Sequence, residues 1–259
     1  MTKTSSDAMG TRRRLPWETI AIVAVILGCA LTTVDFLWAF LRAPMVAGAR
    51  LEEPALIGGT VVTTKMLFSQ KIFYFHVPVA IVSFAFVIVA AVYAVLFLAR
   101  RSERYDVRCR LCMQVGLIFI IATMISGDLW TRHDWGIWWV WEPRLTTYFI
   151  LTLLVIAYFI LRAAIDDPER RARFSAVFAI IAAIDAPISF MITRLIPSSI
   201  HPVVLRSDSG LSPDMLIPFL CGIFGMALVG FGIYRLRLRI EEQAAEVEQL
   251  KREFEQTVA

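Results

Sequence analysis

The chain has 259 residues, of which 58% are hydrophobic and only 19% are charged, and its mean hydropathy is +0.67. A soluble domain usually carries about a quarter of charged residues, so this composition excludes an ordinary soluble fold. The net charge of +4 does not indicate nucleic-acid binding, because the Lys and Arg residues flank apolar runs and form no basic face. We therefore expect one membrane domain.

Six apolar stretches are long enough to cross a membrane. A hydrocarbon core about 30 Å thick needs roughly 20 apolar residues of helix, and helices satisfy their own backbone hydrogen bonds. The expected spans are 18–41, 72–99, 111–129, 145–161, 174–192 and 215–234. They predict an all-α, polytopic protein with six transmembrane helices, in which residues 18–234 form the membrane domain.

Lys and Arg residues fall unevenly on the two sides of these spans. Of the 26 such residues, 18 lie in one set of connections, which comprises 1–17, 100–110, 162–173 and 235–259. The other set comprises 42–71, 130–144 and 193–214. Because connections rich in positive charge stay in the cytoplasm, both termini are predicted to be cytoplasmic, and the loop 130–144 is predicted to face outward.

The segment 235–259 is predicted to form a cytoplasmic helical tail. Its residues Ile240, Val247 and Phe254 are seven apart, which is typical of an amphipathic or coiled helix. The pattern fits a solvated extension and a partner-binding helix equally well.

Cys109 and Cys112 form a C-x-x-C pair, which is compatible with a redox couple or half of a metal site. The sequence holds no second such pair, and Arg108 and Arg110 flank this one. We therefore favour a packing role for both cysteines.

The most unusual segment runs from Trp135 to Arg144 and holds four of the seven tryptophans. One or two would fit an interfacial belt. Four indoles predict an aromatic platform that stacks on a large flat π-system while the N–H groups remain available for hydrogen bonds. Gly136 permits close backbone approach, and Pro143 suits the start of the following helix.

The three histidines are His76, His133 and His201, and all are expected near the face that carries the tryptophans. Neutral imidazole is an axial ligand of haem iron, and two imidazoles from opposite sides can hold a porphyrin between them. The alternative for each is an interfacial hydrogen-bonding group.

Several charged residues are expected near the same face. Arg144 either pairs with a carboxylate through its planar fork or extends toward the interface. Glu142 either orients an indole N–H or favours the positive end of the next helix. The other acidic residues expected at this face are Asp35, Asp128 and Asp134.

Asp185 lies inside the fifth span, two residues before Pro187. Carboxylates within a membrane are costly and are usually functional or paired. We weigh a polar contact between helices against a transport site.

The motif Trp135-Gly136-x-Trp138-Trp139-x-Trp141-Glu142-x-Arg144-Leu145-Thr146 resembles the W-G-x-W-W-x-W-D-x-R-L-T segment of the WWD-motif haem-handling membrane proteins. The similarity is closest to the CcmC family of the cytochrome c maturation (Ccm) system. Lys71 to Pro78 also resembles the segment around that family's first histidine. The resemblance covers about residues 15 to 234.

The resemblance implies a haem-binding site. It implies that His76 and His201 are the axial ligands of the haem iron, whereas His133 has no counterpart. The residues that it implies to bind the cofactor are Trp135, Gly136, Trp138, Trp139, Trp141, Glu142 and Arg144. The cargo is haem b, held without covalent bonds and transferred, so we expect a delivery protein of the bacterial inner membrane and not an enzyme.

The resemblance also implies partners. They are a CcmE-like periplasmic haem chaperone, CcmA- and CcmB-like subunits of an ABC transporter and a small CcmD-like membrane subunit. The chain departs from the family pattern in three places: Glu142 replaces an Asp, Asp185 replaces an Asn, and 193–200 lacks an aromatic pair.

Two other functions are compatible with parts of the sequence. A b-type electron-transfer cytochrome would place histidine pairs within its spans. A secondary transporter for a small solute would build a polar site at the membrane midplane around Asp185 and the proline after it.

Overall fold

The structure is a computed structural model that describes residues 16–43, 55–57, 60–62, 70–196, 201 and 211–258. Its long helices are α1 (Trp17–Leu41), α3 (Phe73–Arg100), α4 (Glu103–Asp134), α5 (Pro143–Ala164), α6 (Pro168–Leu195) and α7 (Pro213–Val258). All six are long and apolar enough to cross a membrane. The prediction of six spans is confirmed. The N-terminal arginines, which contribute to the predicted orientation, lie outside the described residues.

Three short elements were not predicted. Strands β1 (Ala55–Ile57) and β2 (Thr60–Val62) pair antiparallel with Leu56 opposite Val61, and the 3-10 turn η1 (Gln70–Ile72) leads into α3. The hairpin lies in the long connection between the first two spans, so the all-α prediction holds for the membrane domain and not for this connection.

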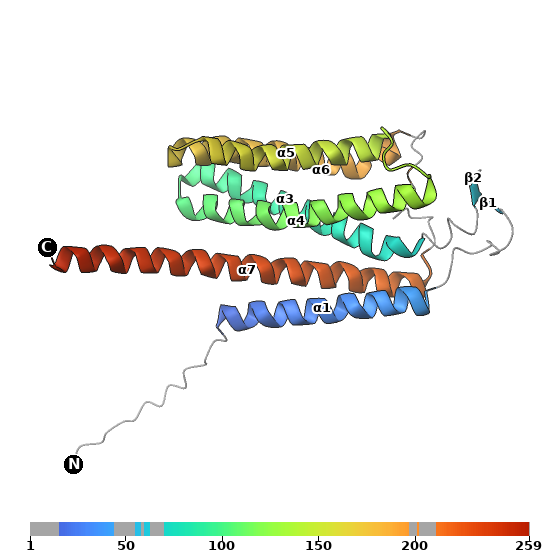
Figure 1. The fold of residues 1–259 in the computed structure, drawn as a ribbon, viewed down its shortest axis with the longest axis horizontal. Helices are drawn as coiled ribbons and strands as arrows, with labels where there is room; N and C mark the ends of the chain where they lie inside the picture. The colour runs from blue at the N-terminus through green and yellow to red at the C-terminus, as the bar shows by residue number, and fades with distance from the viewer. Residues whose placement is uncertain are drawn as a thin grey trace, which may run out of the picture.

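The helices form three layers of two (Figure 1): α5 with α6, α3 with α4, and α1 with α7. The middle pair contacts both outer pairs, because α3 packs against α6 and α7 as well as α4. At one end of the bundle α4 ends and α3 and α5 begin, and we call this the loop end. The opposite end, from which α7 projects, is the tail end.

Small residues bring α1 and α7 close together. A Cβ atom added at Gly28 would lie 2.7 Å from the backbone oxygen of Gly225, and one added at Gly225 would lie 2.6 Å from Oγ1 of Thr32. Glycines at such positions let two helix backbones approach within a membrane, where packing and not water exclusion drives association. Close contact between their backbones therefore holds α1 and α7 together.

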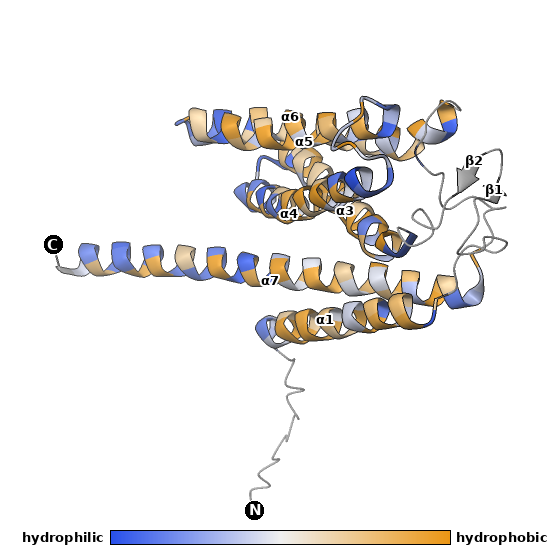
Figure 2. Cartoon of the chain, turned by 45° about the vertical axis from the view of Figure 1, so that its right-hand side comes forward, coloured by the Kyte–Doolittle hydropathy of each residue, from blue (hydrophilic) through white to orange (hydrophobic). Residues whose placement is uncertain are grey.

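The helices of the bundle are mostly hydrophobic, whereas the projecting part of α7 is largely hydrophilic (Figure 2). On α1, for example, Ile26, Leu37 and Phe40 are 56% to 62% exposed. An exposed apolar surface of this kind suits contact with lipid tails, so the chain is a multi-pass membrane protein.

Helix α7 continues for 46 residues to Val258, and its distal part projects beyond the other helices (Figure 1). The tail is thus helical, while its amphipathic role stays a prediction. Ion pairs hold the point where it leaves the bundle: Arg239 lies 2.8 Å from Glu18 of α1, and Arg110 of α4 lies 2.9 Å from Glu241.

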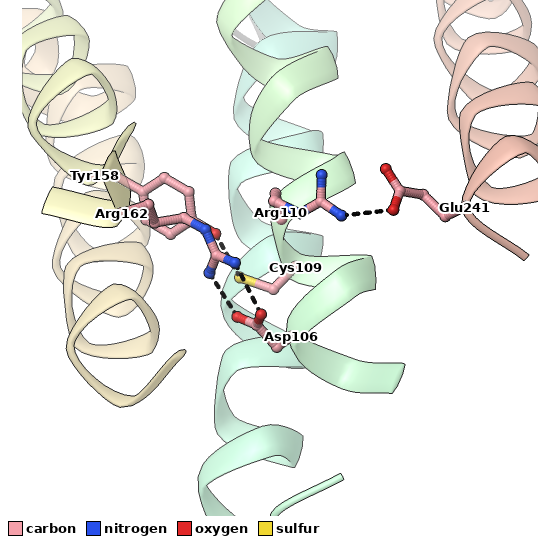
Figure 3. Close-up of polar contacts among 6 residues, drawn as sticks. All are labelled: Asp106, Cys109, Arg110, Tyr158, Arg162 and Glu241. Atoms are coloured by element: carbon pink, nitrogen blue, oxygen red, sulfur yellow. Dashed lines mark hydrogen bonds and ion pairs between the residues drawn. The ribbon is translucent and has the colours of Figure 1, made fainter. Parts of the chain in front are cut away.

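A third ion pair joins α4 to α5 at the tail end (Figure 3). Arg162 donates from both terminal nitrogens to the carboxylate of Asp106, at 2.6 and 2.9 Å. Beside it, Sγ of Cys109 lies 3.8 Å from the hydroxyl of Tyr158. Cys109 and Cys112 are buried free thiols, a position compatible with a packing role.

We expect Arg162→Met to lower the stability of the bundle by about 3–5 kcal/mol, because Asp106 would keep its largely buried charge without its partner. The thermal midpoint of the purified protein in detergent measures this effect. Arg173→Met is the matched control, since the Arg173–Glu169 pair is exposed and spans 3.7 Å. Equal midpoints for both variants would contradict the expectation.

Candidate functional site

His76 lies in the first turn of α3 and faces α4. Its Nδ1 atom is 2.9 Å from the hydroxyl oxygen of Ser126. A Cβ atom added at Gly127 would lie 3.1 Å from Cε1 of the imidazole. The absence of a side chain at Gly127 therefore makes the space in which the ring sits, and Ser126 sets the direction of the ring.

The hydrogen bonds of Ser126 favour one tautomer of His76. The Ser126 hydroxyl lies 2.8 Å from the carbonyl of Ala122 and 3.1 Å from that of Thr123, and it donates its single proton to these acceptors. Its oxygen then accepts from the Nδ1–H group of His76. The lone pair on Nε2 is left for a metal ion, as in metal-binding histidines whose second nitrogen is held by the protein.

His201 joins His76 at the loop end. Its Nδ1 atom lies 3.9 Å from Glu142, and its ring packs edge to face on Trp130 at a centroid distance of 5.9 Å. Ser126, which holds His76, precedes Trp130 by one helical turn of α4. Both histidines therefore lie at the loop end of α4, close to Trp130.

The environment of His201 favours the neutral imidazole. Burial, followed by the nearby charges of Arg144 and His76, holds the pKa of His201 well below its ordinary value. A neutral ring keeps a lone pair for a metal ion at neutral pH.

His133 does not belong to this group. It is exposed, and its Nδ1 atom lies 2.7 Å from the carboxylate of Asp134. His133 is therefore separate from the two histidines that lie close to Trp130 and Ser126.

The Trp-rich loop is shorter than predicted, because α4 continues to Asp134 instead of ending at 129. Thr131, which is buried in this last turn, donates to the carbonyl of Trp138 at 2.8 Å. Gly136 adopts a positive φ of 77°, a conformation that favours glycine, and reverses the chain. The final turn of α4 thus serves as the template on which the loop folds.

The four motif indoles do not form a single flat platform. Trp135 packs edge to face on Trp130, at a centroid distance of 5.0 Å, and His201 packs on the same indole. Trp139 packs edge to face on Trp141 and on Phe149 of α5, at 5.4 and 5.5 Å. The predicted platform is therefore two aromatic groups with differently tilted rings.

Of the four indoles of the Trp-rich motif, Trp138 and Trp141 are exposed, at 58% and 70%. The guanidinium of Arg132 lies 5.8 Å from the ring centre of Trp138 and donates to the carbonyl of Gly136. The outer edge of the loop thus presents two large aromatic side chains to the surroundings.

Glu142 caps α5. Its carboxylate is buried and accepts a hydrogen bond from the backbone N–H of Leu145 at 2.7 Å, while Pro143 fills the first helical position. The negative charge sits at the positive end of the helix, which is the second of the two roles considered for this residue. Because the same carboxylate approaches His201, the cap also links α5 to the imidazole pair.

Two of the carboxylates considered from the sequence lie on the outer helices. Asp35 lies near the loop end of α1, as expected, and it is fully buried against Gly222 of α7. Asp185 lies on α6, and its Oδ2 atom has no hydrogen-bond partner among the described residues. Helices α1 and α6 belong to opposite outer layers (Figure 1), so these two acids do not converge.

Sequence reasoning missed four residues of the site, namely Ser126, Gly127, Trp130 and Phe149. Ser126 and Trp130 are one helical turn apart on α4, and that spacing would have placed them on one face. The signal was lost because the helix was expected to end at 129.

The sequence was also compared with known proteins. The model of the CcmC family, described as Heme exporter protein C, matches residues 18–253. A protein of that name from Rhodobacter capsulatus is 25% identical over 242 residues, which cover 92% of this chain and 90% of the relative. One from Escherichia coli K12 is 27% identical over 225 residues, covering 87% and 82%. The match confirms the resemblance to the CcmC family.

We expect the thermal midpoint of the protein to fall as the pH drops below about 6.5, the ordinary pKa of histidine. The folded chain holds His201 neutral, whereas the unfolded chain takes up a proton there, so acid favours unfolding. His201→Gln removes this contribution and should give a shallower dependence between pH 7.5 and 5. Identical slopes for the two proteins would show that His201 is not shielded.

Proposed function

Because this chain belongs to the Heme exporter protein C family, we propose that it binds haem at the periplasmic face of the inner membrane and delivers it to a CcmE-like haem chaperone. Membership places it in haem export for cytochrome c maturation. The observation that carries the finer proposal is that His201 packs on Trp130 beside Trp135, one helical turn from Ser126, which orients His76.

The described contacts suit haem as a transferable cargo. His76 presents Nε2 because Nδ1 is held by Ser126, and His201 supplies a second neutral imidazole for the opposite side of the iron. Arg144 supplies a guanidinium that fits a propionate in two hydrogen bonds. Ligation by two imidazoles without a covalent bond allows the cargo to leave again.

The exposed indoles favour transfer to another protein. Trp138 and Trp141 lie at the outer edge of the loop, where a porphyrin held by the histidines would stack against aromatic faces and remain within reach of a chaperone. On this proposal the protein is a delivery factor that makes and breaks no bond of the cargo, and not an enzyme.

The proposed orientation places the loop end outside and the tail end in the cytoplasm. Most Lys and Arg residues lie in connections at the tail end. CcmA- and CcmB-like transporter subunits and a CcmD-like subunit are the partners expected for a family member, and the projecting part of α7 is a surface on which one of them could bind.

The arrangement of polar groups disfavours the two other functions. All three histidines are described, and none lies in the middle of a helix, where a b-type electron-transfer cytochrome would hold its haems. Asp35 and Asp185 occupy opposite layers and so do not form the shared midplane site of a solute transporter.

The proposal is tested by His76→Ala and His201→Ala. Each variant should lose most of the co-purifying haem and the load passed to the chaperone, because one axial ligand is removed. Ultraviolet-visible spectra of the purified proteins measure the haem content. His133→Ala is the matched control and should retain wild-type haem. Wild-type haem in both test variants would overturn the assignment of ligands.

Ser126→Ala should weaken haem binding by about 10- to 100-fold, because the Nδ1–H of His76 loses its acceptor and the ring its orientation. Ser126→Thr keeps a hydroxyl and should restore most of the affinity. Haem titration followed at the Soret band measures both variants. Equal losses in the two would indicate a packing effect and not a hydrogen bond.

A further inference from the structure

The distal part of α7, which projects beyond the other helices (Figure 1), carries exposed apolar side chains along one side. Four large apolar residues there are 50% to 71% exposed, and we call them the tail stripe: Ile240, Val247, Leu250 and Phe254. Three of them are seven residues apart, and Leu250 lies three residues after Val247 and four before Phe254. Residues with these spacings share one side of a helix.

The tail stripe points away from the bundle. Leu238, just before it, is only 5% exposed and belongs to the main hydrophobic core. Ile240 follows two residues later, which is about 200° further around a helix with 3.6 residues per turn. The packed face of α7 and the tail stripe therefore lie on opposite sides, so a second helix can lie along the stripe without meeting the bundle.

Glutamates follow both edges of the tail stripe. One row comes one residue after members of the stripe and consists of Glu241, Glu248 and Glu255. The other row comes one residue before members of the stripe and consists of Glu246 and Glu253. Because one residue turns a helix by about 100°, each row lies on one flank and the stripe lies between them.

The tail is acidic as a whole, since residues 240–258 hold six glutamates and two basic residues. Lys251 lies 2.9 Å from Glu248, and Arg239 at the base of the tail lies 3.5 Å from Glu246. The glutamates of these pairs are 57% and 64% exposed, and exposed pairs contribute little free energy. The acidic rows can therefore exchange these contacts for better placed cations.

Two other occupants fit this surface less well than a basic helix. No proline or glycine follows Gly232 in α7, so the usual causes of a kink are absent and the tail continues the direction of the span instead of turning onto the membrane. Its acidic rows would also be repelled by anionic lipid headgroups. A second copy of the chain would bring a further acidic tail alongside the first.

We infer that the tail stripe is the docking surface for a basic amphipathic helix of a second protein, with apolar residues along its centre and Lys or Arg along its edges. Apolar side chains then interlock as in a coiled coil, and opposite charges at the edges select the partner. The inference goes beyond the proposed function and uses only its orientation, which places the tail in the cytoplasm.

The test uses two designed peptides of three heptads that share an Ile and Leu core and carry either Lys or Glu at the edge positions. Each labelled peptide is titrated with the full chain in an uncharged detergent, and fluorescence anisotropy gives the dissociation constant. We expect the Lys peptide to bind about tenfold more tightly than the Glu peptide. Added salt should reduce this difference, because it screens exposed charges.

The double variant Val247→Gln with Leu250→Gln should bind the Lys peptide about tenfold more weakly, because two apolar contacts are lost. Ala245→Gln is the matched control, since Ala245 lies about 200° from Val247 and should bind as the wild type does. Glu246→Lys with Glu253→Lys should reverse the preference in favour of the Glu peptide. This reversal is a gain of binding, which a poorly folded tail would not produce.

Three results would overturn the inference. The wild type binds both peptides equally or neither, the double Gln variant binds the Lys peptide as the wild type does, or sedimentation shows a dimer that this variant abolishes. The last result would assign the tail stripe to a second copy of the chain. Haem content is measured on the same preparations and should be equal in all of them, so a wild type without haem would refute the proposed function separately.

Discussion

The contact between α3 and α4 at the loop end is the constraint on which the site depends. Gly127 leaves room for the ring of His76, and Ser126 one residue earlier holds Nδ1 of that ring. Close helix approach at a small residue and a hydrogen bond across the interface are the two main ways in which membrane helices associate. Here one short stretch of α4 provides both, so helix packing and imidazole orientation have a common origin.

The same helix also determines the shape of the Trp-rich loop. One turn beyond Ser126, Trp130 packs against His201, and Thr131 then binds the carbonyl of Trp138. The loop closes on the cap that Glu142 forms at the start of α5. A displacement of α4 would therefore move an imidazole, an indole and the loop together. This coupling explains how a loop rich in large aromatic side chains keeps a defined conformation at the membrane surface.

The sequence was sufficient for the six spans, because length and apolar composition determine them in a bilayer. It was insufficient for the end of α4, since residues 130–134 are too polar to count as membrane span yet remain helical against the loop. Rotation about a helix axis was equally out of reach: Asp35 lies at the expected height on α1, but it faces Gly222 of α7 and not the tryptophans. The height of a residue along its helix follows from its position in the chain, whereas the direction in which it faces follows from how the helices pack.

The site combines fixed and exposed components, and this division suits delivery. His76 is held by Ser126, and Glu142 is held at the start of α5 close to His201, before any cargo is present. Groups that are already oriented lose little conformational entropy when they bind, so modest contacts suffice for recognition. Trp138 and Trp141, by contrast, are largely exposed, and the aromatic surface that they offer can be shared with a second protein. On the proposed function, the groups held by the helices bind the cargo, and the exposed indoles cover it on the side that faces a second protein. The cargo can then leave from that exposed side while the helices stay folded.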